Sequence, residues 1–298
     1  SPLLGLKKVL GGNVEVSYAQ GYYIPGKKDV NEVNWQEASL ERRIMGEEDP
    51  DSEEQKALRR EIEENRGKLL REACDLAKTA DTVIFVGGLN HDYDTEGRDR
   101  ADMKLPYGQD ELIGALLDIN PDTIVSMHAG SSVEMPWRDR VKALVWCYYS
   151  GMETGSALAD VLLGRVNPSG RLPETFPAWY TDTVTYKNGE FGKEGRVEYK
   201  EGIFIGYRYY ERENIKPAFS FGYGLSYTEF KIDNLAVKKQ TDTVVQITVD
   251  VTNTGDMAGA EVVQCYVSDI ECSVERPPKE LKAYRKVFLQ PGEKKQVQ

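Results

Sequence analysis

An apolar strand running into a long polar loop occupies residues 82–106, which read Thr82-Val-Ile-Phe-Val-Gly-Gly-Leu-Asn-His-Asp-Tyr-Asp-Thr-Glu-Gly-Arg-Asp-Arg-Ala-Asp-Met-Lys-Leu-Pro106. Residues 82–86 are apolar without alternation, which predicts a strand buried on both faces, as in a parallel sheet. Sheets of this kind place their chemistry in loops at the carboxyl ends of the strands. We therefore expect the functional groups of this region in the polar part of the stretch.

Short apolar strands and amphipathic helices alternate on both sides of this strand. The hydrophobic periodicity predicts helices at 3–10, 53–78, 110–119 and 154–163, and strands at 14–19, 82–86, 123–127 and 143–147. Strands and helices taking turns imply βαβ units with helices on the faces of the sheet. The first part of the chain is therefore predicted to be a three-layer α/β sandwich with a mostly parallel sheet.

A strongly charged segment precedes the first buried strand, because 19 of the 32 residues between Glu41 and Glu72 are charged. Both signs are mixed, and pairs such as Glu64–Lys68 and Lys68–Glu72 lie at helical spacing. Mixed charges at this spacing favour a solvated helix face over a helix that docks a partner. We expect a surface excursion at 47–52 before the helix begins.

Helical patterns disappear beyond residue 227. Alternating segments at 230–237, 244–252, 261–267 and 282–289 are separated by turn residues, which is typical of an antiparallel β-sandwich. These are four strands against the roughly seven of an immunoglobulin-like sandwich, so we expect an incomplete one. The predicted domains are an α/β domain at 1–179, an aromatic-rich connecting segment at 180–226, whose rings mostly pack in cores, and a β-domain at 227–298.

Composition limits the classes of function. The chain has 298 residues with a formal charge of −11, which excludes a nucleic-acid or anionic-membrane surface. Its apolar stretches are shorter than the roughly 20 residues of a membrane helix. Four scattered cysteines favour a reducing, cytoplasmic compartment over secretion. No signal-peptide pattern is visible, although the chain opens with Ser1-Pro2 rather than Met.

The polar loop carries the candidate chemistry. It holds five carboxylates with two arginines interleaved, at Asp92, Asp94, Glu96, Asp99 and Asp102, and at Arg98 and Arg100. A buried carboxyl beside other carboxylates has a raised pKa, which suits it to donate a proton near neutral pH. A surface loop of salt-bridged charges is the alternative that this composition leaves open.

Other chemistries find little support in the sequence. No phosphate-binding glycine pattern accompanies Gly87-Gly88, and no nucleophile-elbow pattern surrounds Ser131 or Ser132. With two histidines and no cysteine cluster, no His/Cys metal site is expected, and no cofactor is expected either. Calcium stays open, because carboxylate ligands are abundant, although the EF-hand spacing is absent. His128 is predicted to make a local hydrogen bond at the end of its strand.

The chain carries several motifs in a fixed order. They are Ser1-Pro-Leu-Leu-Gly-Leu, the stretch from Val86 to Pro106 with its Glu-Gly-Arg-Asp-Arg core, Val166-Asn-Pro-Ser-Gly-Arg-Leu-Pro-Glu-Thr-Phe-Pro177, Phe219-Ser-Phe-Gly-Tyr-Gly-Leu-Ser-Tyr-Thr-Glu-Phe230, Val251-Thr-Asn-Thr-Gly255 and Pro277-Pro-Lys-Glu-Leu281. Together these motifs resemble the carboxyl-terminal portion of a family 3 glycoside hydrolase of the β-glucosidase type. The resemblance implies a six-stranded α/β sandwich followed by a truncated fibronectin-III-like β-sandwich. It also implies that a preceding (β/α)8 barrel, which supplies the catalytic nucleophile, is not contained in this chain.

The same resemblance assigns roles within the loop. It implies that Glu96 is the general acid/base of a retaining β-glycosidase, with Asp94 or Asp92 as the alternative acid. Tyr93 and Asp94 are expected to contact the substrate, with Tyr93 forming a wall of the leaving-group site. The expected partners are a β-linked glucoside or oligosaccharide and the barrel, in the same chain or in another. The oligomeric state stays open.

Two further functions stay open for a chain with these motifs. One is a non-catalytic carbohydrate-binding or scaffold protein that keeps the fold without the activity. The other is β-xylosidase specificity, because the resemblance places the choice of sugar in the barrel.

Overall fold

The computed structural model describes residues 1–25, 53–97, 99–189 and 195–298. The chain divides into two compact units, Ser1–Ala159 and Asp160–Gln298, which are described separately below. The surface excursion predicted at 47–52 lies outside the described residues. No helix in the described part of the chain is both long and apolar enough to span a bilayer.

A parallel three-stranded sheet forms the centre of the first unit. Its strands are β1 (Ile84–Gly88), β2 (Ile124–His128) and β3 (Ala143–Trp146), in the order β1-β2-β3. Ile84 pairs with Ile124, which pairs in turn with Ala143, so all three strands end at the same edge. The parallel arrangement confirms the prediction for the fold. The described residues of this unit form three strands where the resemblance implied six.

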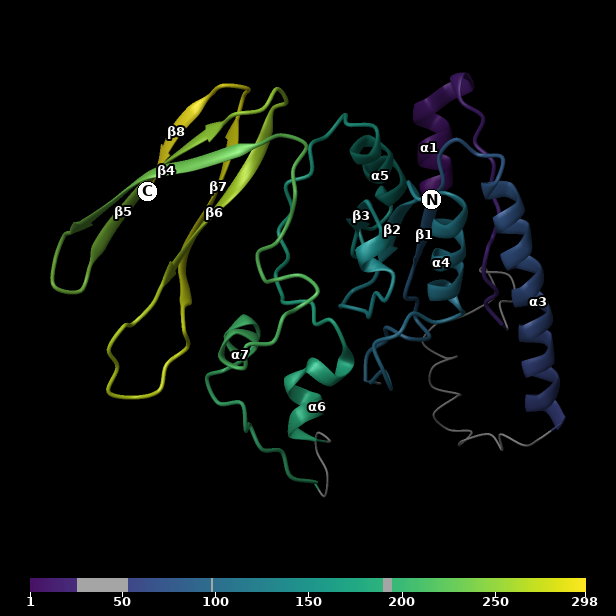
Figure 1. Ribbon diagram of the computed structural model, residues 1–298, viewed down its shortest axis with the longest axis horizontal. Coiled ribbons are helices and arrows are strands. Elements are labelled where there is room, and N and C mark those ends of the chain that lie inside the picture. The colour runs from purple at the N-terminus through teal and green to yellow at the C-terminus, as the bar shows by residue number, and fades with distance from the viewer. Residues whose placement is uncertain (26–52, 98, 190–194) are drawn as a thin grey trace. The chain divides into compact units, whose positions relative to one another are not determined.

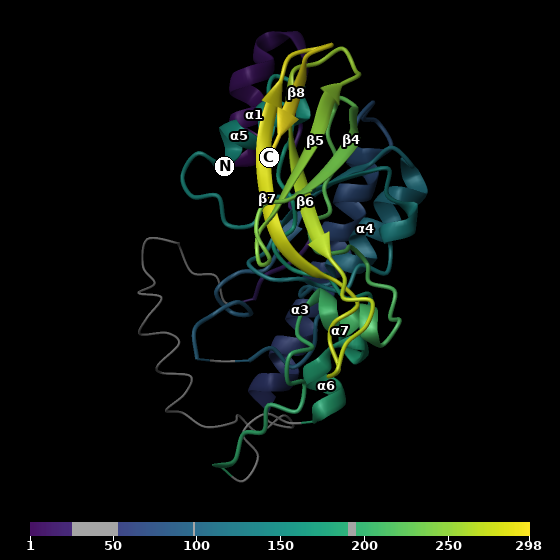
Figure 2. The same ribbon diagram turned by 90° about the vertical axis from the view of Figure 1, so that its left-hand side faces the viewer.

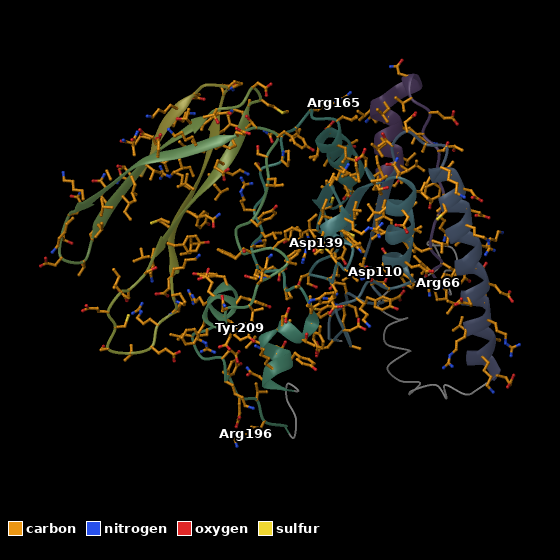
Figure 3. All side chains as sticks on the ribbon, viewed as in Figure 1. Arg66, Asp110, Asp139, Arg165, Arg196 and Tyr209 are labelled. Carbon is orange, nitrogen blue, oxygen red and sulfur yellow. The ribbon has the colours of Figure 1, made fainter. Side chains whose placement is uncertain are left out.

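Four α-helices accompany the sheet in the described part of this unit, and all four were predicted to within one or two residues at each end. They are α1 (Pro2–Leu10), α3 (Glu53–Ala77), α4 (Gln109–Ile119) and α5 (Thr154–Leu162). α4 packs against β1, and α3 lies alongside α4 (Figure 1). Arg66 of α3 pairs with Glu111 of α4, and Figure 3 labels Arg66 together with Asp110 at the start of α4. Most of α3 is exposed, as its charges predicted.

Two glycines explain how α1 and α5 come together. A Cβ on Gly5 would lie 2.0 Å from the carbonyl oxygen of Gly155, and a Cβ on Gly155 would lie 2.1 Å from that of Ser1. Because both obstacles are backbone atoms, neither can move aside as a side chain would. The glycine of the first motif is therefore required by close packing between helices.

The strand predicted at 14–19 is wrong. The segment is extended and mostly exposed, and it pairs with no strand among the described residues. Alternation of apolar and polar residues fits a strand only where a neighbouring strand takes up the backbone hydrogen bonds. No sheet edge is paired with this segment, so the alternation did not produce a strand.

The second unit begins with two short helices that the sequence did not predict. They are α6 (Val184–Asn188) and α7 (Tyr207–Arg212). Phe204, Tyr209 and Tyr210 form a buried cluster here, and Figure 3 labels Tyr209 within it. Three aromatic residues of this segment therefore form a small core, whereas Tyr186, Tyr199 and Tyr223 are exposed, so the prediction holds for only part of the set.

Five antiparallel strands complete the described part of the second unit, and Figure 2 labels each of them. They are β4 (Phe230–Lys239), β5 (Val245–Asn253), β6 (Gly259–Val267), β7 (Glu280–Leu289) and β8 (Lys294–Val297). The first sheet has the order β4-β5-β8, and β6 pairs with β7 in the second. Val251, Leu289 and Val297 are buried between them. The four predicted strands are present, and the sequence analysis missed only the short β8.

Polar contacts hold the segment before β4 together and join it to β6. The Asn167 Oδ1 accepts hydrogen bonds from the Ser226 hydroxyl and the Tyr227 N–H, at 2.9 and 2.8 Å. Arg171 forms an ion pair with Glu261 of β6, in which one guanidinium nitrogen lies 2.8 Å from each carboxylate oxygen. These contacts explain why the compact unit begins at residue 160 rather than at the first strand.

Candidate active site

The candidate site lies at the carboxyl edge of the parallel sheet, where the polar loop leaves β1. At this point Gly88 has φ of 143°, and the Gln109 side chain binds both of its backbone polar groups. The Gln109 Oε1 accepts from the Gly88 N–H at 2.7 Å, and its Nε2 donates to the Gly88 carbonyl at 2.8 Å. Gln109 is fully buried, so the first turn of the loop is anchored to the start of α4.

Glu96 lies exposed within this loop. It makes no hydrogen bond or ion pair to another described residue, so its carboxylate is available to a partner outside them. Gly97 follows it with φ of 72°, a backbone angle that glycine adopts without steric cost. Glu96 is therefore presented to solvent, and no arginine that the structure describes holds it inward.

Asp94 is engaged by neighbouring loops. Its Oδ2 accepts a hydrogen bond from the Gly130 N–H at 3.0 Å and another from the Tyr149 hydroxyl at 2.8 Å. Burial, together with the Asp94 carboxylate, raises the pKa of Tyr149 well above its usual value. The hydroxyl therefore stays protonated at neutral pH and remains a donor.

Arg100 anchors the loop on the other side of Glu96. Its Nη2 donates to the Ser131 Oγ at 3.1 Å and to the Ser132 carbonyl at 3.0 Å. Its Nη1 is buried without a hydrogen-bond partner among the residues that the structure describes. Arg98, the other arginine of the motif, lies outside the described residues.

A second group of side chains organises the start of the loop. The Tyr107 hydroxyl donates to the Asp92 carboxylate at 3.0 Å and accepts from the Asn90 amide at 3.0 Å. Tyr93 packs edge-on against the Tyr107 ring, with centroids 5.4 Å apart, and is 40% exposed. The structure thus places Tyr93 at the surface of the loop, where a ring can contact a ligand.

A cleft of about 220 Å³ opens beside this loop. It is lined by Asn90, Tyr107, Gln109 and His128, with apolar walls from other residues. The His128 Nε2 lies 3.2 Å from the Ser126 hydroxyl, which confirms the predicted local hydrogen bond, and burial lowers the pKa of this histidine. Within the described ranges, no three His, Cys, Asp or Glu side chains gather as a metal site.

Sequence reasoning missed the residues that hold the loop in place. Gly130 and Tyr149 follow β2 and β3, so they lie 36 and 55 positions from Asp94. No local pattern connects such distant positions. One signal was present in the sequence: Gly130 and Tyr149 both follow predicted strands. Because the carboxyl ends of parallel strands lie at the same edge of a sheet, the loops after these strands must lie close together.

The fold and this site define a class of protein: an α/β domain that presents an acidic strand-end loop, followed by fibronectin-III-like strands. A model of the glycosyl hydrolase family 3 C-terminal domain matches residues 1–227, and a model of the fibronectin type III-like domain matches residues 261–298. The chain therefore belongs to glycosyl hydrolase family 3, of which it contains the C-terminal domain. The first match ends at the position where the predicted β-domain begins.

Known relatives share most of this chain but extend far beyond it. Thermostable beta-glucosidase B of Acetivibrio thermocellus is 46% identical over 233 residues, which cover 77% of this chain and 31% of that protein. Probable beta-glucosidase I of Aspergillus niger is 47% identical, with 78% and 29% covered. The crystal structure of the beta-glucosidase from Kluyveromyces marxianus in complex with glucose matches with a TM-score of 0.75 and 47% identity, over 78% of this chain and 28% of that one. This chain spans roughly three tenths of their length.

Proposed function

We propose that this chain is the acid/base-supplying C-terminal portion of a retaining, β-glucosidase-like glycosidase, and that Glu96 is the general acid/base. The observation that carries the proposal is the contrast within one loop. The residues on both sides of Glu96 are tied to the sheet, through Asp94 and through Arg100, while the Glu96 carboxylate is exposed. A proton donor must be held in place and yet remain accessible.

The chemistry requires two carboxyl groups on opposite sides of the scissile bond. In a retaining glycosidase they lie about 5–5.5 Å apart. In the first step Glu96 donates its proton to the glycosidic oxygen as the C1–O bond breaks and a carboxylate of the missing barrel bonds to C1. In the second step the Glu96 carboxylate takes a proton from water, which attacks C1 and releases the barrel carboxylate.

Several features support a partner domain for this chain. The relatives are named beta-glucosidases, the matched part covers only 31% and 28% of two of them, and one is described in complex with glucose. The described residues form sheets of three, three and two strands and no barrel. A buried guanidinium nitrogen without a partner, Arg100 Nη1, costs stability unless a group outside these residues satisfies it. The substrate is a β-linked glucoside or oligosaccharide, and Tyr93 forms a wall of its leaving-group site.

The test replaces Glu96 in the full-length enzyme that joins this chain to its barrel. Glu96→Ala should lower kcat/KM on methyl β-glucoside, whose leaving group needs a proton, by about 10²- to 10⁴-fold. On 2,4-dinitrophenyl β-glucoside, whose leaving group needs little protonation, cleavage of the C1–O bond should be nearly unaffected. Equal losses on both substrates would contradict the assignment of Glu96.

The 298-residue chain alone should hydrolyse neither glucoside, because it lacks the attacking carboxylate. Hydrolysis that disappears with Glu96→Ala in the isolated chain would overturn this part of the proposal. A full-length protein that binds glucosides but hydrolyses none would instead identify a non-catalytic carbohydrate-binding protein.

A further inference from the structure

We infer that Asp94 and Tyr149 are positioning residues that hold the Glu96 loop against the carboxyl edge of the sheet. This role rests on the proposed function of Glu96 as the acid/base. It differs from the substrate contact that the sequence predicts for Asp94. Neither residue needs to touch substrate, because both act through the position of Glu96, two residues further along the chain from Asp94.

Asp94 joins the loops that follow all three strands of the parallel sheet. Its own loop follows β1, Gly130 follows β2, and Tyr149 follows β3. Both donors converge on one oxygen, the Asp94 Oδ2, at 3.0 and 2.8 Å. Hydrogen bonds to a charged acceptor are roughly twice as strong as neutral ones, so these contacts fix the loop better than ordinary turn contacts would.

The loop after β1 is held in place on both sides of Glu96. Arg100, four residues after Glu96, binds Ser131 and Ser132, which directly follow the Gly130 that binds Asp94. The short segment after β2 thus binds a residue on each side of Glu96, Asp94 before it and Arg100 after it. Two anchors on one rigid segment restrict where the intervening residues can lie, and precise placement of a proton donor is what acid catalysis requires.

The backbone at Gly130 and next to Tyr149 allows both residues to approach Asp94 closely. A Cβ on Gly130 would lie 2.7 Å from the Asp94 Oδ2 and 3.0 Å from the Tyr149 ring. Tyr148, directly before Tyr149, has φ of 48°, a conformation that side chains other than glycine rarely adopt. The surrounding structure must compensate for this strain, and in return the Tyr149 hydroxyl reaches Asp94.

The experiment compares Asp94→Asn and Tyr149→Phe with Glu96→Ala in the full-length enzyme, on the same two glucosides. Each positioning variant should lower kcat for methyl β-glucoside by about tenfold or more, because misplacing a catalytic group by about 1 Å can cost 10²-fold. The KM and the cleavage of 2,4-dinitrophenyl β-glucoside should be nearly unchanged. Gly130→Ala, which displaces Asp94 sterically, should give the same pattern.

A double variant separates positioning from a general structural effect. When Glu96→Ala is already present, adding Tyr149→Phe should lower methyl β-glucoside hydrolysis no further, because the hydroxyl acts only through Glu96. Asp122→Asn is the matched control. It makes the same chemical change at an exposed carboxylate outside the loop, where Asp122 pairs with the Lys142 ammonium at 2.6 Å, and it should retain full activity.

Each outcome decides between the two proposals. Additive losses in the double variant, or losses from Asp94→Asn and Tyr149→Phe that are equal on both glucosides or smaller than twofold, would overturn the positioning role. If Glu96→Ala nevertheless keeps its dependence on the leaving group, the proposed function stands. If Glu96→Ala loses that dependence as well, the proposed function fails and the positioning role fails with it.

Discussion

Replacing Arg171 by methionine should destabilise the unit at 160–298 by an amount that its structure allows us to estimate. The Arg171 Nη2 lies 2.8 Å from both oxygens of Glu261, and the two side chains are only 10% and 18% exposed. Breaking a buried ion pair by removing one partner costs about 3–5 kcal/mol, because the remaining charge is uncompensated. Here the Glu261 carboxylate keeps a hydrogen bond from the Val262 N–H at 2.7 Å. We therefore expect a loss near the lower limit, about 3 kcal/mol.

The assay is thermal unfolding of the 298-residue chain, followed by circular dichroism. For a unit of this size a loss of about 3 kcal/mol corresponds to a fall in Tm of about 10 °C. Arg196→Met is the matched control, because Arg196 forms an ion pair with Glu198 at 2.9 Å while 80% exposed, and Figure 3 labels it. Exposed pairs contribute about 0–1 kcal/mol, so the control should shift Tm little.

A double-mutant cycle with Glu261→Gln completes the argument. Because Glu261→Gln removes the stranded charge, adding it to Arg171→Met should recover part of the lost stability. An Arg171→Met variant that unfolds with the Tm of Arg196→Met would refute the reasoning. It would show that the segment before β4 is not tied to β6 by this pair.

Two further predictions concern stability. The Asn253 side chain is fully buried and donates to the Met257 and Leu289 carbonyls at 2.9 and 3.2 Å, so Asn253→Ala should cost about 2–4 kcal/mol in urea unfolding; a loss below 1 kcal/mol would contradict this. Burial lowers the pKa of His128 in the folded chain, so between its ordinary pKa of about 6.5 and the lower folded value the unfolded chain binds more protons. Its contribution to stability is complete above pH 6.5 and declines as the pH falls below it, and His128→Asn should flatten that part of the stability profile relative to the wild type.

Much of the fold was predictable because its signals are local. The apolar run at 82–86 and the stripe of α3 depend on neighbours within one element. The strand forms two residues later than predicted, at Ile84–Gly88, and α3 forms within one residue of its predicted bounds. The segment at 14–19 shows the limit of such signals. Its alternation suits a strand, but a strand also requires a partner from elsewhere in the chain, and its sequence does not contain that information. β8 has four residues, too few for a periodicity to be recognised.

In the candidate site, too, local features were predictable from the sequence and features that depend on distant residues were not. The loop and its acidic residues were predicted, since they follow directly from the strand that precedes them. The exposure of Glu96 beside the engaged Asp94 could not be predicted, because it depends on Gly130 and Tyr149, which only the folded sheet brings near. In the sequence, Asp94 and Glu96 are two carboxylates of one loop with nothing to distinguish them. Their hydrogen-bond partners in the folded chain distinguish them.

The most direct test of Glu96 as the acid/base uses azide with the full-length Glu96→Ala enzyme and 2,4-dinitrophenyl β-glucoside. Azide is a nucleophile that needs no base, so it should attack the covalent glucosyl–enzyme and accelerate turnover, releasing β-glucosyl azide with retained configuration. The wild type, whose Glu96 carboxylate activates water, should form none. Failure to detect β-glucosyl azide with Glu96→Ala, together with its appearance with Asp94→Ala, would contradict the assignment and transfer the role to Asp94.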